Sequence, residues 1–455
     1  MMETLFAAAQ RIGATLSGDN AGFSRVITDT RQLSSGDLFV ALKGDRFDGH
    51  EFVAQAAAQG AVGALVSRKI ECALPQIVVG DTLTALQAYA ASWRHDFDLP
   101  VVAVTGSNGK TTTKQLLSAI AAARGPVLAT QGNLNNHIGL PLTLLSMRRE
   151  HRTAVIEMGA NHLGEIALLT ELTRPNIGVI TQAGDAHLEG FGSREGVARG
   201  KGELFAGLAG GVAVINADDA YAPLWREMAA GSSVISFGFS VHADVRALHV
   251  QPHPHDAPTG MRFELRAPEG GQTVTLPLPG QHNVSNALAA AACGVALGMD
   301  LRDIAAGLAR VEAPQGRVNW KQTPEGARLL DDSYNANPTS LRAGMELLAA
   351  LPGQRILVLG GMAELGPEAP RLHHEAGRAA KTLGINRLYT LGALAGEAAQ
   401  AFGEGAQAFE NVDELADALR PQLNKNVALL VKGSRSSRME RVVAALTGES
   451  AGGGH

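Results

Sequence analysis

Short apolar runs alternate with helical patterns along most of this chain. In its centre, the apolar runs at 153–157, 177–181 and 212–216 are separated by stretches in which apolar residues recur at helical spacing. Continuous short apolar runs are typical of buried parallel strands, and the stretches between them are typical of crossover helices. This part of the chain is therefore predicted to form a parallel sheet covered by helices.

The pattern changes after the central runs. Residues 232–278 carry several short alternating runs, which predict an antiparallel edge, and an Ala-rich helix is expected over 284–297. Beyond Pro314 a new alternation of strands and helices begins. This alternation predicts a Rossmann-like unit. Its strands are expected at 328–331, 355–359, 387–391 and 427–431.

The N-terminal part reads as a separate, small α/β unit. A polar stretch meets Pro100 just before the next apolar run, which indicates a domain boundary. The chain has 455 residues and is too long for a single core. We therefore predict an α/β protein with three domains, at 1–98, 99–313 and 314–455. The predicted elements of the first domain are strands at 26–28, 38–42, 62–66 and 76–79 and helices at 50–59 and 82–94.

Composition narrows the class of protein. The net charge is −5 and the chain has no runs of like charge, so the sequence shows no basic patch of the kind that binds nucleic acid. No apolar run reaches the length of about 18 residues that a membrane span needs, and the first residues lack a basic region. The two cysteines lie far apart in sequence and fit a reducing compartment. We expect a soluble, cytoplasmic protein with no nucleic-acid partner and no stable membrane association.

The strongest chemical signal is a Gly-rich turn between an apolar strand at 101–104 and a helical pattern. Such a turn presents backbone N–H groups and a helix N-terminus to a phosphate, a lysine adds a point charge, and a threonine hydroxyl can hold Mg²⁺. Only two residues separate the two glycines, whereas the usual loop has four between Gly and Gly-Lys. The alternative is an ordinary strand–turn–helix, but the complete pattern favours a central domain of the P-loop ATPase type. The candidate nucleotide-binding residues are Gly106, Ser107, Asn108, Gly109, Lys110, Thr111 and Thr112.

Two further residues are candidate metal ligands. Glu157 ends a predicted strand of the same sheet, where a carboxylate is a natural Mg²⁺ ligand, although a solvated acid is the plainer alternative. His187 lies in the loop after the next strand and can hold a metal, but a single histidine is as often structural. Lys201, taken by itself, reads as a surface lysine.

Paired amides and a dense polar cluster complete the candidate set. Asn283 and Asn286 share a helix face, where they can bind an adenine edge or cap the helix, and the local pattern favours a cap. The segment 331–338 holds two acids, a tyrosine and two asparagines directly after a strand, with Arg317 nearby as a phosphate contact. The turn at 431–438 is a second candidate anion site or a Ser-capped basic turn.

The first domain offers a weaker candidate site. The segments 28–31 and 43–50 flank a predicted strand pair and carry Arg31 and Lys43, which can bind a diphosphate. Ordinary turn chemistry explains the same residues, and the local pattern favours that alternative.

Read together, these segments resemble the Mur ligases over essentially the whole chain. The short glycine loop is this family's own form, and alone it also fits folylpolyglutamate synthetase. The stretches at 132–136 and 331–338 point to the family member that joins D-alanyl-D-alanine to a UDP-linked tripeptide. The segments that carry the resemblance are 105–112, 132–136, 157–161, 186–193, 331–338 and 432–435.

The resemblance implies a reaction. ATP, UDP-N-acetylmuramoyl-tripeptide and D-alanyl-D-alanine would give the pentapeptide, ADP and phosphate through an acyl phosphate. The acyl phosphate must be kept from water, so we expect the third domain to close onto the second around residues 313–316. The alternatives are a related ligase with another acceptor, such as a folate or another amino acid, and a nucleotide-gated binding module. We expect a monomer.

The resemblance also implies roles for single residues. Lys110 would hold the β- and γ-phosphates, Thr111 the first Mg²⁺, Glu157 and His187 would serve the metals, and Lys201 would be carbamoylated to form an anionic metal ligand. The remaining expected contacts are Asn283, Asn286, Arg317 and Asp332 for ATP, and Thr30, Arg31, Lys43, Asn135, Asn136, Asn335 and Asn337 for the other substrates. The sequence departs from the family at Gly361, where relatives usually carry an acid.

Overall fold

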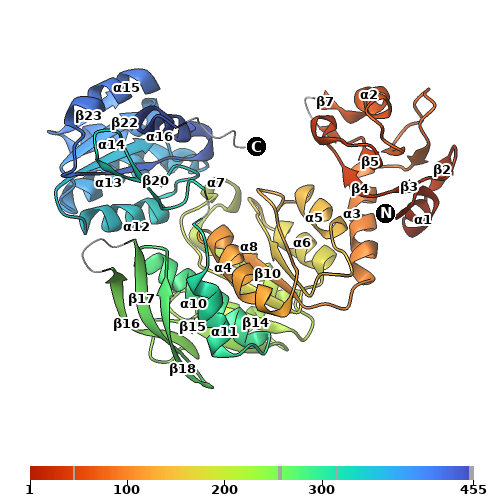
Figure 1. The fold of residues 1–455 in the computed structure, drawn as a ribbon, viewed down its shortest axis with the longest axis horizontal. Coiled ribbons are helices and arrows are strands. Elements are labelled where there is room, and N and C mark those ends of the chain that lie inside the picture. Colours follow the sequence, from red (N-terminus) through yellow and green to blue (C-terminus); the bar gives the residue numbers. More distant parts are fainter. Residues whose placement is uncertain (45–46, 255–258, 314, 450–455) are drawn as a thin grey trace. The chain divides into compact units, whose positions relative to one another are not determined.

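The computed structural model describes residues 1–44, 47–254, 259–313 and 315–449. The fold is α/β and contains three main sheets, which confirms the predicted class and the three-domain architecture (Figure 1). By their contacts the residues group into two compact units. The first comprises Met1–Ala103, Arg124–Gly159 and Glu165–Asn176, and the second comprises Val104–Ala123, Ala160–Gly164 and Ile177–His455.

The first unit begins with a five-stranded sheet of order β2-β9-β8-β5-β4. Strands β4, β5, β8 and β9 pair in parallel, and β2 pairs antiparallel at one edge. Phe39, Val53, Ala56 and Val66 form part of the core between this sheet and its helices. The elements are α1 (Leu5–Arg11), β2 (Thr15–Ser17), β4 (Arg25–Ile27), β5 (Asp37–Val40), α2 (Val53–Ala58), β8 (Gly63–Val66), β9 (Gln76–Val78) and α3 (Thr82–His95).

The four predicted strands of this region and the helix at 82–94 are confirmed to within a few residues. The predicted helix at 50–59 is a 3-10 turn over Gly49–Phe52 followed by the shorter α2. Two small antiparallel pairs were not predicted, because strands of two residues carry no readable alternation. They are β1 (Glu3–Thr4) with β3 (Gly22–Phe23) and β6 (Lys43–Gly44) with β7 (Phe47–Asp48).

The first unit also contains one end of the central sheet, in the order β11-β12-β10. β11 (Val127–Ala129) pairs in parallel with β12 (Thr153–Glu157). The helices of this region are α5 (Gly139–Leu145) and α6 (Glu165–Thr173). β10 (Val101–Thr105) is buried along its whole length and carries the chain into the second unit.

In the second unit the sheet order is β10-β13-β14-β15-β16-β17-β18. β13 and β14 match the predicted strands, and β14 and β15 pair in parallel. The expectation that 232–278 is wholly antiparallel is therefore wrong for β15. A crossover helix, α9 (Ala222–Met228), connects β14 to β15, and such a crossover permits parallel pairing. Antiparallel pairing holds for β16 with β17 and for β17 with β18. The strands are β13 (Ile177–Ile180), β14 (Val212–Asn216), β15 (Ser233–Gly238), β16 (Val245–His253), β17 (Gly260–Ala267) and β18 (Gly270–Leu276).

Two helices pack beside the helix that follows the Gly-rich turn. α4 (Lys110–Ala121) contacts both α10 (Gln281–Ala296) and α11 (Leu301–Ala309) (Figure 1). Residues 287–294 of α10 are all buried, which explains the run of alanines there. The Ala-rich helix expected over 284–297 is confirmed, and it begins three residues earlier, at Gln281.

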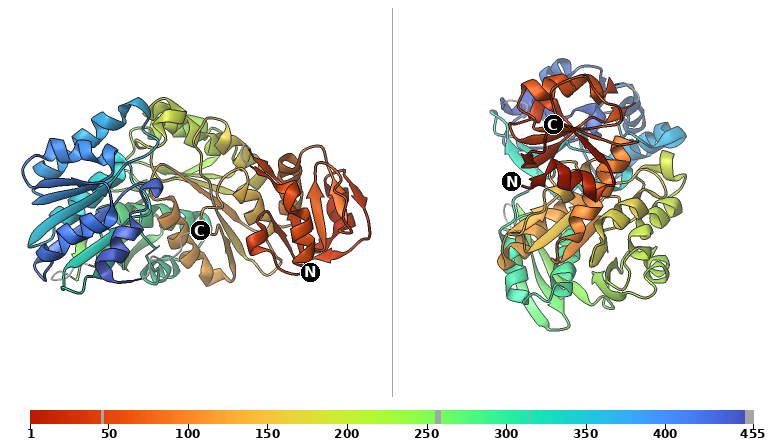
Figure 2. Two further views of the ribbon diagram at one scale, coloured as in Figure 1. Left: turned by 90° about the horizontal axis from the view of Figure 1, so that it is seen from above. Right: turned by 90° about the vertical axis from the view of Figure 1, so that its right-hand side faces the viewer.

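The C-terminal sheet has the order β19-β20-β24-β21-β22-β23. All neighbouring pairs are parallel except β19 with β20, which confirms the Rossmann-like prediction. Helices α12, α13 and α14 pack on one face and α15 and α16 on the other (Figure 2). The elements are β19 (Asn319–Gln322), β20 (Arg328–Asp332), α12 (Pro338–Ala349), β21 (Gln354–Gly360), α13 (Ala369–Thr382), β22 (Arg387–Leu391), α14 (Ala393–Phe402), β23 (Ala406–Phe409), α15 (Val412–Leu419), β24 (Val427–Lys432) and α16 (Glu440–Thr447).

The two predicted domain boundaries stay predictions. The boundary after residue 98 lies between α3 and β10. The boundary before Pro314 falls at a position outside the described residues. Throughout the part of the chain that is described, no helix combines the length and the apolar character needed to cross a bilayer.

Candidate active site

The Gly-rich turn after β10 is closely packed and depends on its two glycines. Gly106 has φ +140° and Gly109, the N-cap of α4, has φ +81°. A Cβ atom at Gly106 would lie 2.0 Å from Thr181 Oγ1, and one at Gly109 would lie 2.1 Å from Asn286 Oδ1. Both the backbone conformation and the space therefore require glycine.

The loop after β13 holds the turn in place. Thr181 Oγ1 donates to the carbonyl of Asn108 at 2.6 Å, and Ser107 N donates to the carbonyl of Gln182 at 2.9 Å. Ser107 Oγ accepts from Gly184 N at 2.9 Å. These bonds fix the backbone of the turn before any ligand is bound.

The chemistry of the turn suits an anion. α4 begins at Lys110, so the first N–H groups of the helix and its positive dipole end face the turn. Lys110 Nζ donates to the carbonyl oxygens of Gly106 at 2.7 Å and Ser107 at 3.4 Å. The ammonium group therefore lies over the turn, where a phosphate would be cradled.

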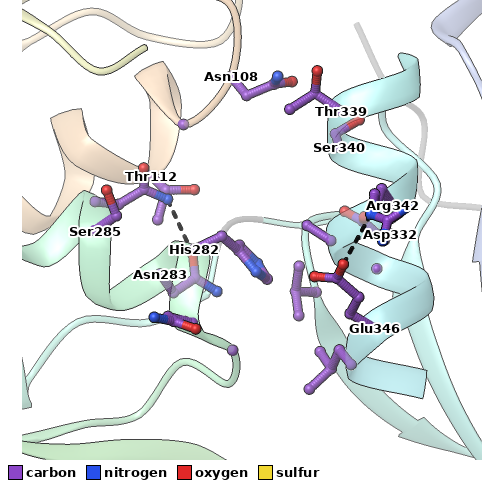
Figure 3. Close-up of a pocket in the computed structure, with 18 of the residues that line it drawn as sticks. Asn108, Thr112, His282, Asn283, Ser285, Asp332, Thr339, Ser340, Arg342 and Glu346 are labelled. Carbon is purple, nitrogen blue, oxygen red and sulfur yellow. Dashed lines mark hydrogen bonds and ion pairs between the residues drawn. The ribbon is translucent and has the colours of Figure 1, made fainter. Parts of the chain in front are cut away.

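A cavity of about 1040 Å³ opens from this turn. One wall carries His282, Asn283 and Ser285, and the opposite wall carries Arg342 and Glu346 of α12 (Figure 3). Drug-sized ligands occupy pockets of roughly 300–1,000 Å³, so the space is sufficient for a nucleoside triphosphate. Of the predicted nucleotide contacts, those lining it are Ser107, Asn108, Gly109, Lys110, Thr111, Thr112, Asn283, Asn286, Arg317 and Asp332.

The paired amides at the start of α10 do not cap the helix. Gly280 is the N-cap, and Asn283 and Asn286 lie inside the first two turns. Asn283 Nδ2 donates to the carbonyl of Pro279 at 2.8 Å, and Asn286 Nδ2 donates to Asn283 Oδ1 at 3.2 Å. The capping alternative is therefore wrong, because the helix begins two residues before Asn283. Burial lowers the pKa of the adjacent His282, which favours a neutral ring at pH 7.

The polar cluster after β20 is tied to β24 by a buried ion pair. Lys432 Nζ contacts Asp332 Oδ2 and also donates to the carbonyl of Asn335 at 2.9 Å. Burial raises the pKa of Asp331, whose Oδ1 accepts from Ser333 Oγ at 2.6 Å. Lys432 belongs to the turn considered as a second anion site, but its ammonium group neutralises Asp332 instead.

Arg317 and Asn337 also reach the cavity. The Arg317 guanidinium lies 4.3 Å from the ring centroid of Tyr334. Asn337 is the N-cap of α12, and its Nδ2 donates to Asn108 Oδ1 at 2.8 Å. Asn335 lines the same cavity. The cluster at 331–338 and the glycine turn therefore face one cavity.

His187 lies against a residue that the sequence analysis did not select. Its Nδ1 atom is 2.5 Å from Glu364 Oε2, and this contact with His187 lowers the pKa of Glu364. Both residues have positive φ, +56° and +61°. Glu364 follows the carboxyl end of β21, and that placement at a sheet's binding edge is the signal that identifies it.

Lys201 is not a surface lysine. It lies on α8 (Arg194–Ala206) and is fully buried, with an exposed fraction of 0%. Its Nζ atom donates to the carbonyl of Ala160 at 3.0 Å and lies 5.0 Å from the ring centroid of Phe191. The surface interpretation is therefore wrong, because seven residues of α8 are buried and Lys201 is one of them.

Glu157 lies in the first unit and is also buried, at 3% exposure, so the alternative of a solvated acid is wrong. Its Oε1 atom accepts from Asn135 Nδ2 at 2.8 Å. Asn136 Oδ1 accepts from Gly139 N at 2.9 Å, at the start of α5. Asn135 thus holds the carboxylate of Glu157, and Asn136 holds the start of a helix.

The candidates of the N-terminal part lie at the surface of the first unit. Arg31 forms an ion pair with Asp29 at 2.7 Å and its side chain is 87% exposed. Thr30 is half-buried in the same 3-10 turn, and Lys43 is exposed on β6. Asp45 and Arg46 of the 43–50 segment lie outside the described residues. Within the described ranges, no group of three or more His, Cys, Asp or Glu side chains could hold a metal ion.

Three family models match this chain. They are the Mur ligase family catalytic domain over residues 23–122, the Mur ligase middle domain over 104–294 and the Mur ligase glutamate ligase domain over 316–435. The chain belongs to the Mur ligase family. The Gly-rich turn, residues 281–294 of α10 and the 331–338 cluster of this Mur ligase all fall within the matched segments.

Curated relatives share most of its length. A UDP-N-acetylmuramoyl-tripeptide--D-alanyl-D-alanine ligase from Escherichia coli is 45% identical over 96% of both chains. The enzyme of the same name from Bacillus subtilis is 38% identical over 92% of both.

Solved structures agree with the sequence relatives. MurF from Acinetobacter baumannii superposes with a TM-score of 0.91 at 37% identity, covering 98% of this chain and 99% of that one. MurF ligase from Thermotoga maritima, solved in complex with ADP, gives 0.81 at 27% identity, covering 93% and 97%. A Mycobacterium tuberculosis folylpolyglutamate synthase shares the fold at 19% identity.

The contact between Gly109 and Asn286 generates a prediction. Replacing Gly109 with alanine should weaken ADP binding at least about tenfold, because the new methyl group must displace Asn286 and distort the turn. Isothermal titration with ADP measures the effect. Gly392 is a matched control: it is also a helix N-cap, has φ +88° and has nothing within 4 Å of its Cβ position. If both alanine variants bind ADP like the parent, the packing argument is wrong.

Proposed function

We propose that this chain is an ATP-dependent ligase that joins D-alanyl-D-alanine to the tripeptide carboxylate of UDP-N-acetylmuramoyl-tripeptide in peptidoglycan precursor synthesis. The observation that carries the proposal is the sequence identity of 45% and 38% to two ligases of that name, over 96% and 92% of the chain. The cavity supports it, because its walls combine a phosphate-binding turn with the C-terminal sheet's binding edge.

The residues around the turn fit the triphosphate of ATP. The two glycines leave room where a Cβ would block the turn, and the N-terminus of α4 and Lys110 supply positive charge. Lys110 would exchange its bonds to the carbonyl oxygens of Gly106 and Ser107 for the β- and γ-phosphates. Asn283 and Asn286 line the cavity and would contact the adenine, and Arg317 and Asp332 line the same cavity.

The reaction must first activate the carboxylate, which has no good leaving group. A carboxylate is a poor acyl donor, so its oxygen first attacks the γ-phosphorus of ATP, ADP leaves, and an acyl phosphate forms. The neutral amine of D-alanyl-D-alanine then attacks the acyl carbon, the C–O bond to phosphate breaks, and the amine loses a proton. The enzyme contributes positioning and charge neutralisation, which is most of what a protein supplies in phosphoryl transfer.

Mg²⁺, when bound, would neutralise charge on the β- and γ-phosphates. Thr111, Glu157, His187 and Lys201 are the residues we assign to hold it. Within the second unit, Thr111 offers a hydroxyl beside the phosphate turn and His187 lies against Glu364. Within the first unit, Glu157 is held by Asn135. Outer partners of this kind commonly orient metal ligands.

Lys201 can be a metal ligand only if its positively charged amine becomes an anionic group. A fully buried ammonium group is costly and would repel a cation. Carboxylation by CO₂ turns the amine into a carbamate, which is an anionic oxygen ligand. We therefore propose that Lys201 is carbamoylated.

The other substrates are assigned to the remaining polar residues. Thr30, Arg31 and Lys43 would contact the UDP end, and Asn135, Asn136, Asn335 and Asn337 would contact the peptide portions. Closure of the C-terminal part around 313–316 would exclude water from the acyl phosphate. We also propose that the protein is a monomer and is cytoplasmic, where ATP is supplied.

A phosphate-release assay tests the function. Phosphate release is expected with ATP, the UDP-tripeptide and D-alanyl-D-alanine together, and it should fall at least tenfold when the dipeptide is replaced by single amino acids. Three UDP-tripeptides that differ in their third residue identify the preferred acceptor. Faster turnover with a folate and glutamate would favour another ligase, and turnover of ATP alone would favour a nucleotide-gated module.

Rescue of a Lys201 variant tests the carbamate. Lys201→Ala should lose most ligase activity, because an anionic ligand is missing, and added acetate or formate should restore part of it. Steady-state rates with and without the short acid measure the effect. A matched control is Lys381→Ala, since Lys381 is a surface residue of α13 that bonds to the carbonyl of Glu404. Full activity of Lys201→Ala without any added acid would end the proposal.

A further inference from the structure

One hydrogen bond joins the phosphate turn to the C-terminal sheet's polar cluster. Asn337 Nδ2 donates to Asn108 Oδ1 at 2.8 Å, across 229 positions of sequence. Asn108 lies between the two glycines of the turn, and Asn337 precedes the first turn of α12.

The orientation of the Asn337 amide is fixed by its role as a helix cap. Its Oδ1 atom accepts from Ser340 N at 2.9 Å, and its backbone N donates to Ser340 Oγ at 3.1 Å. Because the oxygen is committed to the helix, the NH₂ group is the end that faces the turn.

The orientation of the Asn108 amide follows from this contact. Its backbone carbonyl accepts from Thr181 Oγ1 at 2.6 Å, and its Oδ1 is occupied by Asn337. Its Nδ2 atom is buried and has no hydrogen-bond partner among the residues that the structure describes. A buried amide donor normally has a partner, so this NH₂ group needs one from a ligand.

The place of this donor is the phosphate end of the cavity. Asn108 and Thr339 face each other from opposite sides in Figure 3, and both line the cavity. Lys110 Nζ lies over the carbonyl oxygens of Gly106 and Ser107, the residues just before Asn108. Asn283 and His282, which we assign to the adenine, lie on a different segment from Asn108 in Figure 3.

We propose that Asn108 Nδ2 donates a hydrogen bond to an oxygen of the terminal phosphate of ATP, and that Asn337 is the positioning residue that turns the amide toward it. The inference rests on the proposed function, because it concerns the same nucleotide. Because Asn337 caps α12, the hydrogen bond from Asn108 to the terminal phosphate then depends on α12 lying against the turn. ADP, which lacks the γ-phosphate, does not receive this bond.

The test compares two nucleotides in one variant. Asn337→Ser keeps a good helix cap without adding charge, but its side chain is too short to reach Asn108. The affinity for a methylene analogue of ATP should fall about tenfold, in line with a lost hydrogen bond to a charged group, while the affinity for ADP stays the same. Isothermal titration of both nucleotides in Mg²⁺ gives the ratio of the two affinities.

The control makes the same change at another cap. Asn411 caps α15 by accepting from Glu414 N at 2.8 Å, and Asn411→Ser should leave the ratio unchanged. Asn108→Ala should lower the ratio as much as Asn337→Ser does, and the double variant should lower it no further.

An unchanged ratio in Asn337→Ser or in Asn108→Ala overturns the inference. If Asn337→Ser does not fold, Asn108→Ala still decides it, since Asn108 caps no helix. Wild-type phosphate release with the two substrates reports on the proposed function separately, because the affinity ratio is measured with neither substrate present.

Discussion

The site depends on how closely the backbone of the phosphate turn approaches its neighbours. Gly106 lies against Thr181, and Gly109 lies against Asn286, with no room for a methyl group at either position. This contact fixes α10 beside α4, and the alanines of α10 allow the two helices to pack closely. The amides that face the cavity are thus set by the same packing that sets the phosphate turn.

Polar contacts between distant segments join the central sheet to the C-terminal sheet. The pairs Asn108–Asn337 and His187–Glu364 each join a loop of the central sheet to a loop of the C-terminal sheet, and Lys432 neutralises Asp332 beneath the polar cluster. A buried ion pair contributes little net stability, but it is costly to break. These contacts therefore serve geometry more than stability, because they hold loops of the two sheets in fixed positions relative to each other.

The sequence alone predicted the parts of the fold that have a strong local signal. The strand–turn–helix around Gly106 and Gly109, the Rossmann-like strands and the Ala-rich helix all have clear periodicity. Prediction from the sequence failed where a feature depends on tertiary contacts. Burial of Lys201, the parallel pairing of β15 and the Glu364 contact with His187 are decided by neighbours far away in sequence. The amide of Asn135 holds the carboxylate of Glu157, and no local pattern indicates that partner.

The central claim is that the turn holds the terminal phosphates of ATP so that they can activate a carboxylate. Lys110 tests it most directly, because its ammonium group lies over the turn. In a single-turnover experiment, Lys110→Ala should slow formation of the new amide by at least about 10²-fold, the usual loss when a charge-stabilising group is removed. Amide formation at the parent rate would contradict the account.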